Sequence, residues 1–193
     1  MDDDPFEFSP TRRRYLTVTG FAVAGALAGC LGDGRDAEVP RPIALTGHKQ
    51  CDHCGMVIEE HPGPAGQLFY EDTKPEAHDN PARFCSAWET FANKFHREGD
   101  GWTVSSGYLT DYSSVEYELF DKGGSTFISA HLDSEAFGPI EDLFYAVGTD
   151  IKGSMGTDLI PFSDEADADA FAEEYGGTVY TADDISRDLI AQL

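Results

Sequence analysis

The spacing of apolar residues first identifies a helix in the middle of the chain. Five of them recur every three or four positions, as on one face of a helix: Phe84, Trp88, Phe91, Ala92 and Phe95. This pattern predicts a helix over residues 86–97 with an aromatic inner face. Ser86 followed by Glu89 three positions later is typical of a capping box at a helix start. The polar, glycine-containing residues 98–101 end the helix.

Short β-prone runs separated by glycine, proline and acidic residues predict the strands. Before and directly after the aromatic helix the runs lie at residues 56–58, 67–70 and 102–104. Further along the chain they lie at residues 114–120, 126–130, 143–147, 159–162 and 178–180. A polar loop is expected over residues 72–81, and a glycine-rich loop is expected over residues 152–156.

The second part of the chain repeats the order of strands, helix and closing strand. A second helix is predicted from Ser163 to Tyr175, and a short helix is predicted at the C-terminus. The inner face of the second helix is expected to consist of Ala166, Ala170 and Phe171. The sequence therefore predicts an α+β fold of two similar small halves packed together, over residues 48–107 and 108–193.

The first residues of the chain carry the features of an export signal. Arg12 and Arg13 precede an aromatic residue and a leucine, which resembles a twin-arginine (Tat) signal. The apolar run at residues 18–29 is shorter than the ~20 residues needed to span a bilayer. The run ends in Leu-Ala-Gly before Cys30, which resembles a lipobox, where the cysteine becomes the lipidated first residue of the mature protein.

These features predict a signal peptide over residues 1–29 and an exported protein. A lipid on Cys30 is expected to anchor this protein to the outer face of the cytoplasmic membrane. Residues 31–42 are charged, contain glycine and proline, and show no apolar periodicity. A flexible tether is therefore expected over residues 30–47. Lipidation removes the Cys30 thiol and leaves three cysteines in an oxidising compartment.

The charge of the chain excludes one class of partner. The formal net charge is −23 for 193 residues, with 36 acidic and 13 basic side chains. Such a field repels nucleic acid and anionic lipid, so a nucleic-acid-binding function is not expected. The acidic excess fits the solvated surface of a protein from a salt-loving organism, where high ionic strength screens the self-repulsion.

Residues 51–56 have the sequence Cys-Asp-His-Cys-Gly-Met. The pair formed by Cys51 and Cys54 is the main chemical signal in the chain. A structural zinc site usually needs two such pairs, so Cys85 and a histidine would have to complete it. The candidate histidines are His48, His53, His61 and His131. A thioredoxin-like dithiol usually opens a helix, whereas the residues after this pair favour a strand. A disulfide from either cysteine to Cys85 stays open.

Met56 changes the balance between these interpretations. Thioether and thiolate sulfur are soft donors that select Cu(I) over zinc, magnesium or calcium. Gly55 allows the backbone to bend so that Cys54 and Met56 face one centre. A methionine at the start of a strand is as often a core residue, so the local sequence leaves both readings of Met56 open.

Several motifs in a fixed order resemble the NosL family of nitrous oxide reductase accessory proteins. In chain order they begin at Cys54 (Cys-Gly-Met-Val-Ile), His61 (His-Pro-Gly-Pro), Arg83 (Arg-Phe-Cys-Ser), Leu109 (Leu-Thr-Asp-Tyr), Tyr145 (Tyr-Ala-Val-Gly-Thr-Asp), Gly153 (Gly-Ser-Met-Gly), Ala170 (Ala-Phe) and Gly176 (Gly-Gly-Thr-Val). The resemblance runs from about residue 48 to residue 185. Members of the family often have proline where this chain has Ser154.

The resemblance implies an exported, lipid-anchored Cu(I) chaperone with two ββαβ-type halves and a role in denitrification. Such a protein delivers copper for the copper centres of nitrous oxide reductase, together with the maturation machinery of that enzyme. Its mechanism is ligand exchange, so it is not an enzyme. The implied copper ligands are Cys54, Met56 and Met155, and Cys51 and Cys85 match cysteines of many members.

Two other classes of function stay open from the sequence. One is a thiol–disulfide oxidoreductase that uses Cys51 and Cys54. The other is a lipoprotein that is stabilised by structural zinc or a disulfide and acts as a docking partner. The metal content after anaerobic purification distinguishes the three classes, because they predict Cu(I), no metal and zinc.

Overall fold

The computed structural model describes residues 39–193. The predicted signal peptide, Arg12, Arg13 and Cys30 lie outside the described residues. Within the described part of the chain, no helix is long and apolar enough to cross a membrane.

Residues 40–45 pack against the domain, although the sequence predicted a flexible tether up to residue 47. The carbonyl of Pro40 accepts a hydrogen bond from the Tyr108 hydroxyl at 2.7 Å. The Leu45 side chain is fully buried, and its N–H donates to the carbonyl of Leu132 at 2.8 Å. The packed domain therefore begins earlier than predicted, because the buried Leu45 side chain and hydrogen bonds to the backbone of Pro40 and Leu45 hold this segment in place.

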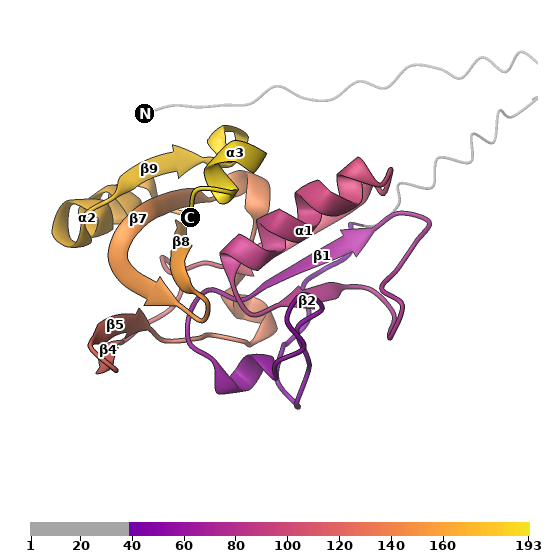
Figure 1. The fold of residues 1–193 in the computed structure, drawn as a ribbon, viewed down its shortest axis with the longest axis horizontal. Helices are drawn as coiled ribbons and strands as arrows, with labels where there is room; N and C mark the ends of the chain where they lie inside the picture. Colours follow the sequence, from indigo (N-terminus) through magenta and orange to yellow (C-terminus); the bar gives the residue numbers. More distant parts are fainter. Residues whose placement is uncertain (1–38) are drawn as a thin grey trace, which may run out of the picture. The chain divides into compact units, whose positions relative to one another are not determined.

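The first sheet has four antiparallel strands in the order β2-β1-β3-β6. The strands are β1 (Gly66–Tyr70), β2 (Ala82–Phe84), β3 (Val104–Thr110) and β6 (Phe137–Pro139). The helix α1 (Ala87–Gly99) packs against β1, as Figure 1 shows. The predicted helix over residues 86–97 is confirmed, and its inner face contributes the fully buried Phe91 to the core.

The second sheet is built around the long strand β7. Its strands are β4 (Leu119–Lys122), β5 (Ser125–Ile128), β7 (Phe144–Gly153), β8 (Gly156–Phe162) and β9 (Thr178–Thr181). The first residues of β7 lie between β8 and β9, both antiparallel to it, and Lys152 near its end pairs with β5 in parallel. The helix α2 (Glu165–Tyr175) packs on β7, β8 and β9.

The two sheets contain the same unit of strand, strand, helix and strand. In β1-β2-α1-β3 the first strand lies between the other two, and β7 has the same place in β7-β8-α2-β9. The α+β prediction is confirmed. The boundary expected at residue 107 falls inside β3 (Val104–Thr110), and β6 from the second part of the chain joins the first sheet.

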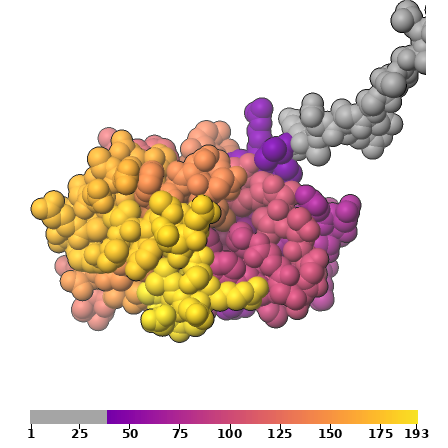
Figure 2. Space-filling view, turned by 90° about the horizontal axis from the view of Figure 1, so that it is seen from above, coloured from indigo at the N-terminus to yellow at the C-terminus, as the bar shows by residue number. Residues whose placement is uncertain are grey.

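Short elements complete the chain. They are the 3-10 helices η1 (Ile58–Glu60), η2 (Ser134–Ala136), η3 (Ile140–Asp142) and η4 (Ala182–Asp184), and the C-terminal helix α3 (Arg187–Ile190). The space-filling view shows the C-terminal segment, in yellow, against the part of the chain that contains α1, in magenta (Figure 2). The indole N–H of Trp88 donates to the carbonyl of Ile190 at 2.8 Å and fixes this contact.

Four local predictions were wrong. The second helix is capped by Asp164, whose carboxylate accepts from the N–H of Ala166 at 2.9 Å, and not by Ser163. The helix therefore buries Ala168 with Phe171 and leaves the two alanines expected inside, Ala166 and Ala170, exposed. Residues 114–118 form no strand, because Ser114 closes a turn onto the carbonyl of Asp111. The run expected as a strand over residues 56–58 makes a single bridge and then enters η1.

Side chains of the second sheet enter the core of the first half. Tyr145 of β7 is fully buried and meets Phe91 of α1 edge-on, with 5.3 Å between the ring centroids. Asp158 of β8 is 1% exposed, and its Oδ1 accepts from the N–H of Trp88 in the first turn of α1 at 2.8 Å. Gly153 leaves the space that the Asp158 carboxylate fills. The second half therefore caps the helix of the first.

Burial raises the pKa of Asp158 to about 8, although the N–H groups of Trp88 and Leu159 act in the opposite direction. In the unfolded chain this group titrates near 3.8. Between these two values the folded protein must keep a proton that the unfolded chain releases. The free energy of unfolding therefore falls as the pH rises from about 4 to about 8, and the contribution of Asp158 levels off above that.

We expect Asp158→Asn to match the parent in stability near pH 4 and to exceed it by about 1 kcal/mol or more near pH 8. Asparagine keeps an oxygen for the N–H of Trp88 but has no charge to desolvate. Urea unfolding at several pH values measures the effect. Asp164→Asn is the matched control, because it removes one carboxylate from an exposed cap. An Asp158→Asn curve parallel to that of the parent would contradict the prediction.

Candidate metal site

The Cys51–Met56 segment forms a tight turn that directs cysteine side chains inwards. The N–H of Cys51 donates to the carbonyl of Met56 at 2.8 Å, and the N–H of Gly55 donates to the carbonyl of Cys51 at 2.9 Å. Gly55 has a φ of +76°, in the left-handed region that favours glycine. The bend predicted at Gly55 is therefore present.

Asp52 fastens this turn to strand β2. Its N–H donates to the carbonyl of Arg83 at 2.8 Å, and its Oδ2 accepts from the N–H of Arg83 at 2.7 Å. The imidazole of His78, from the loop before β2, lies 2.9 Å from Oδ1 of the same carboxylate. Because β2 leads directly to Cys85, these contacts fix the turn relative to the third cysteine.

Cys85 and Glu89 lie at the start of helix α1. The Ser86 hydroxyl accepts from the N–H of Glu89 at 2.9 Å, as expected for a capping box. The Glu89 carboxylate points elsewhere: its Oε2 accepts from the N–H of Cys85 at 3.3 Å and from the Cys85 thiol at 3.0 Å. Glu89 therefore holds Cys85 through both its backbone N–H and its thiol.

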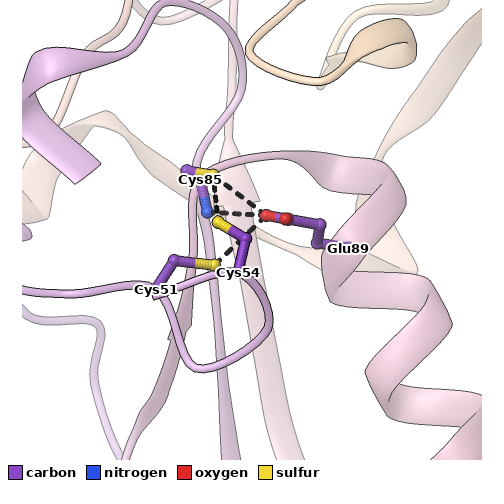
Figure 3. Close-up of side chains that lie close together, drawn as sticks. All are labelled: Cys51, Cys54, Cys85 and Glu89. Atoms are coloured by element: carbon purple, nitrogen blue, oxygen red, sulfur yellow. Dashed lines mark hydrogen bonds between the residues drawn. The ribbon is translucent and has the colours of Figure 1, made fainter. Parts of the chain in front are cut away.

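Three thiols and one carboxylate come together at this point, and we call Cys51, Cys54, Cys85 and Glu89 the thiol–carboxylate cluster. One donor atom from each of the four lies within 4.8 Å of the others. Oε2 of Glu89 also accepts from the Cys51 thiol at 3.2 Å, and the sulfurs of Cys54 and Cys85 are 3.6 Å apart (Figure 3). All three cysteines are free thiols in the structure.

The members of the cluster differ in their exposure. Cys51 and Cys85 are 3% and 2% exposed, and Glu89 is fully buried. Cys54 is only partly buried. Cys54 is therefore the thiol of the cluster that faces solvent, while the other two thiols are buried.

The environment changes the acidity of the thiols. The neighbouring Cys85 thiol lowers the pKa of Cys51 to about 7, against the effect of burial. The pKa of Cys85 is raised, mainly because of the neighbouring Cys51 sulfur and also because the site is desolvated. Desolvation likewise raises the pKa of Cys54 to about 11. Cys51 is therefore the most acidic thiol of the cluster.

The two predicted methionines differ in their surroundings. Met56 closes the turn through its carbonyl, and its partly buried side chain packs against the main core. Met155 is 49% exposed at the tip of the β7–β8 hairpin. The neighbouring Ser154 hydroxyl donates to the carbonyl of Cys85 at 2.7 Å, which proline at this position would not do. That bond places the hairpin beside the cluster.

Among residues 39–193, no histidine takes part in the cluster. Nδ1 of His53 is hydrogen-bonded to Nδ2 of Asn93 at 2.7 Å. Nε2 of His131 is hydrogen-bonded to the Ser129 hydroxyl at 3.1 Å. His48 lies at the surface, 3.0 Å from the carboxylate of Glu59. The fourth member is Glu89, which the sequence analysis treated only as a capping residue. An acid four positions after Cys85, one helical turn from that thiol, is the signal that could have identified it.

Comparison with known proteins supplies an independent result. The sequence model of the NosL family matches residues 42–190. The "Copper-binding lipoprotein NosL" of Stutzerimonas stutzeri is 28% identical over 179 residues, which cover 91% of this chain and 82% of that protein. The protein of the same name from Achromobacter cycloclastes is 26% identical over 183 residues, which cover 93% of this chain and 83% of that protein.

A solved structure is also similar. It is described as the crystal structure of the copper chaperone NosL from Shewanella denitrificans, and it superposes with a TM-score of 0.60 at 28% sequence identity. The match covers 75% of this chain and 95% of the solved chain. The similarity therefore extends over nearly the whole of the packed domain.

Proposed function

This chain belongs to the NosL family, and from that premise we propose that it is an exported, lipid-anchored protein that binds Cu(I) and delivers it for assembly of the copper centres of nitrous oxide reductase. Its similar relatives are named copper-binding lipoproteins, and the similar solved structure is named a copper chaperone. The proposed partners are the reductase and its maturation machinery.

The observation that carries the proposal is the meeting of three free thiols from two separate segments of the chain. Thiolates are soft donors and favour Cu(I) over harder cations. Cys54 is the proposed central ligand, with Met56 and Met155 as thioether donors and Cys51 or Cys85 completing the set. No hydrolytic or phosphate-binding motif competes with this interpretation in the sequence.

Exposure supports transfer by ligand exchange. The partly exposed Cys54 and the half-exposed Met155 are accessible to a donor from a partner protein, whereas Cys51 and Cys85 are buried. An incoming sulfur can therefore bind the copper before the buried thiols release it. A fully buried set of ligands would hold the ion too inertly for a delivery protein.

Replacing Met56 by leucine tests the role of the thioethers. Leucine keeps the volume of the side chain, so we expect a stability cost below about 1.5 kcal/mol and weaker Cu(I) binding. Anaerobic titration against a chromophoric Cu(I) chelator measures the affinity. Met155→Leu is expected to weaken binding with no measurable loss of stability, because that side chain is half exposed. Parent-like affinity in both variants would leave only the thiols as ligands.

Delivery and anchoring have their own tests. Apo nitrous oxide reductase incubated with the copper-loaded protein is expected to gain copper, and the same amount of copper on a chelator of equal affinity is expected to transfer more slowly.

Cys30 lies outside the described residues. The intact mass of the native protein tests the anchor, since an unmodified Cys30 would exclude it.

A further inference from the structure

A pocket lined by aromatic rings lies in the second half of the chain and shares no residue with the thiol–carboxylate cluster. It lies between helix α2 and the segment that follows β3, and its volume is about 270 Å³. Five of its lining residues are aromatic, and we call the site the aromatic pocket: Tyr112, Tyr117, Phe162, Phe171 and Tyr175. The proposed function uses none of these side chains.

The rings of the aromatic pocket pack against one another. The centroids of Tyr112 and Tyr117 are 5.5 Å apart. The centroid of Phe171 lies 5.2 Å from that of Phe162 and 4.8 Å from that of Tyr175. Tyr112, Phe162 and Phe171 are buried, whereas Tyr117 and Tyr175 are partly exposed. The pocket therefore has buried rings inside and two partly exposed rings at its edge.

Two carboxylates give the aromatic pocket a negative charge. Asp167 and Glu174 of helix α2 both line it, and both are exposed. Desolvation raises the pKa of the Tyr117 hydroxyl, and Glu174 and Asp167 raise it further. The field of the two carboxylates therefore reaches the rings.

In the part of the chain that the structure describes, these carboxylates have no cationic partner. No ion pair among residues 39–193 includes Asp167 or Glu174. The cationic side chains that lie over aromatic rings in the same range contact Phe95 or Trp102 instead. The last turn of α2 contains no basic side chain, although the C-terminal end of a helix favours positive charge. A cation from outside would therefore meet unpaired carboxylates and uncovered rings.

We propose that the aromatic pocket binds a small, free quaternary ammonium ion. The rings would surround its methyl groups, and Asp167 and Glu174 would neutralise its charge from the edge of the pocket. This site would act independently of the metal site.

The lining suits a quaternary ammonium ion better than a primary one. Aromatic faces attract cations, and cages of aromatic rings bind quaternary ammonium groups. A primary ammonium group has three N–H donors that need acceptors, whereas a quaternary nitrogen has none. The buried hydroxyl of Tyr112 already donates to the carbonyl of Ser129 at 2.9 Å. Ligand pockets usually have volumes of about 300–1,000 Å³, so a pocket at the lower end of this range selects a small ion.

A simpler role for these rings is to form the apolar core of the second half, to which Tyr112, Phe162 and Phe171 belong. In that case a neutral molecule of the same shape would bind as well as the cation, or neither would bind. Choline and 3,3-dimethyl-1-butanol make this comparison, because they differ in a charged nitrogen that is replaced by carbon. The pair therefore separates attraction to a cation from simple apolar contact.

The experiment titrates the reduced full-length protein with choline chloride and follows the methyl protons of choline by NMR. We expect an upfield shift, because the methyl groups lie over ring faces, and a dissociation constant on the order of 1 mM. The affinity for 3,3-dimethyl-1-butanol is expected to be at least about threefold lower. Methylammonium chloride, the primary ammonium probe, is also expected to bind more weakly than choline. Sodium chloride at equal concentration is the control for ionic strength.

Two variants test the rings and the charge separately. Tyr117→Leu keeps an apolar side chain but removes a π face, so choline should bind about threefold more weakly or worse. Glu174→Gln should weaken choline by about twofold to fivefold. Glu173→Gln is the matched control, because this exposed neighbour does not line the pocket; its affinity should equal that of the parent. Thermal unfolding checks that Tyr117→Leu is folded, and Glu174→Gln changes only an exposed side chain.

Several outcomes would overturn the proposal. They are no choline binding by the parent, equal affinity for choline and its neutral analogue, tighter binding of methylammonium, or parent-like affinity in both variants. Glycerophosphocholine, the soluble head group of a choline lipid, is expected to bind more weakly than choline, because Asp167 and Glu174 repel its phosphate. Tighter binding of that head group would overturn the assignment to a free ion. Cu(I) affinity is expected to stay unchanged in Tyr117→Leu and Glu174→Gln, so this proposal and the proposed function can fail independently.

Discussion

Cys54→Ser is expected to lose Cu(I) binding by more than about a hundredfold, because replacing a ligand should exceed the 10- to 100-fold cost of changing an outer-shell partner. The substitution replaces the partly exposed thiol of the cluster by a hydroxyl, which is a poor ligand for a soft ion. Its volume and hydrogen-bonding capacity change little, so the fold should survive. Competition with a Cu(I) chelator under reducing conditions measures the affinity.

Cys51→Ser and Cys85→Ser test the two buried thiols in the same way. Both thiols are buried, so their replacement should cost stability as well as copper affinity. A Cys54→Ser protein that still binds Cu(I) within threefold of the parent would show that the buried pair holds the ion. The solvent-facing thiol would then have no part in the site.

Phe91→Ala is expected to destabilise the protein by about 3–5 kcal/mol. The ring is 2% exposed and packs between Phe95 of its own helix and Tyr145 of the second sheet. Truncation leaves a cavity where the two halves meet. Urea unfolding, followed by circular dichroism and tryptophan fluorescence, measures the change.

Phe120→Ala is the matched control for this loss of an aromatic ring. Phe120 is 40% exposed and stacks only on Phe127 at the end of the second sheet. We expect it to cost less than about 1 kcal/mol. Equal costs for the two substitutions would mean that the contact between Phe91 and Tyr145 does not hold the halves together.

The parts of the fold that were predicted correctly are those fixed by local spacing. Helix α1 follows from the recurrence of Trp88, Phe91 and Phe95, and strand β1 follows from a short β-prone run. The start of α2 was misplaced by one residue, because Ser163 and Asp164 are both good capping residues. Which of them caps the helix depends on Asp111, which is distant in sequence and accepts from the N–H of Ser163.

The candidate site was only partly predictable for the same reason. The cysteines and methionines are recognisable by their chemistry and by the family motifs. Glu89 has a standard local explanation as a capping residue, and that explanation hid its second role. Only the folded chain shows that the turn at Cys51 and the start of α1 meet, because the contact depends on Asp52 and its bonds to strand β2.

The strand–strand–helix–strand unit occurs twice in the chain, yet its two copies are unequal. Among the described residues, Cys85 lies within the first copy, and Cys51 and Cys54 lie on the turn that precedes it. The second copy supplies the Ser154 hydroxyl, which donates to the carbonyl of Cys85, and the Asp158 carboxylate, which accepts from the N–H of Trp88. The metal donors and the residues that support their position thus come from different parts of the chain. A fragment that ended after β3 at Thr110 would carry the thiols without Ser154 and Asp158, the residues of the second copy that bind Cys85 and the start of helix α1.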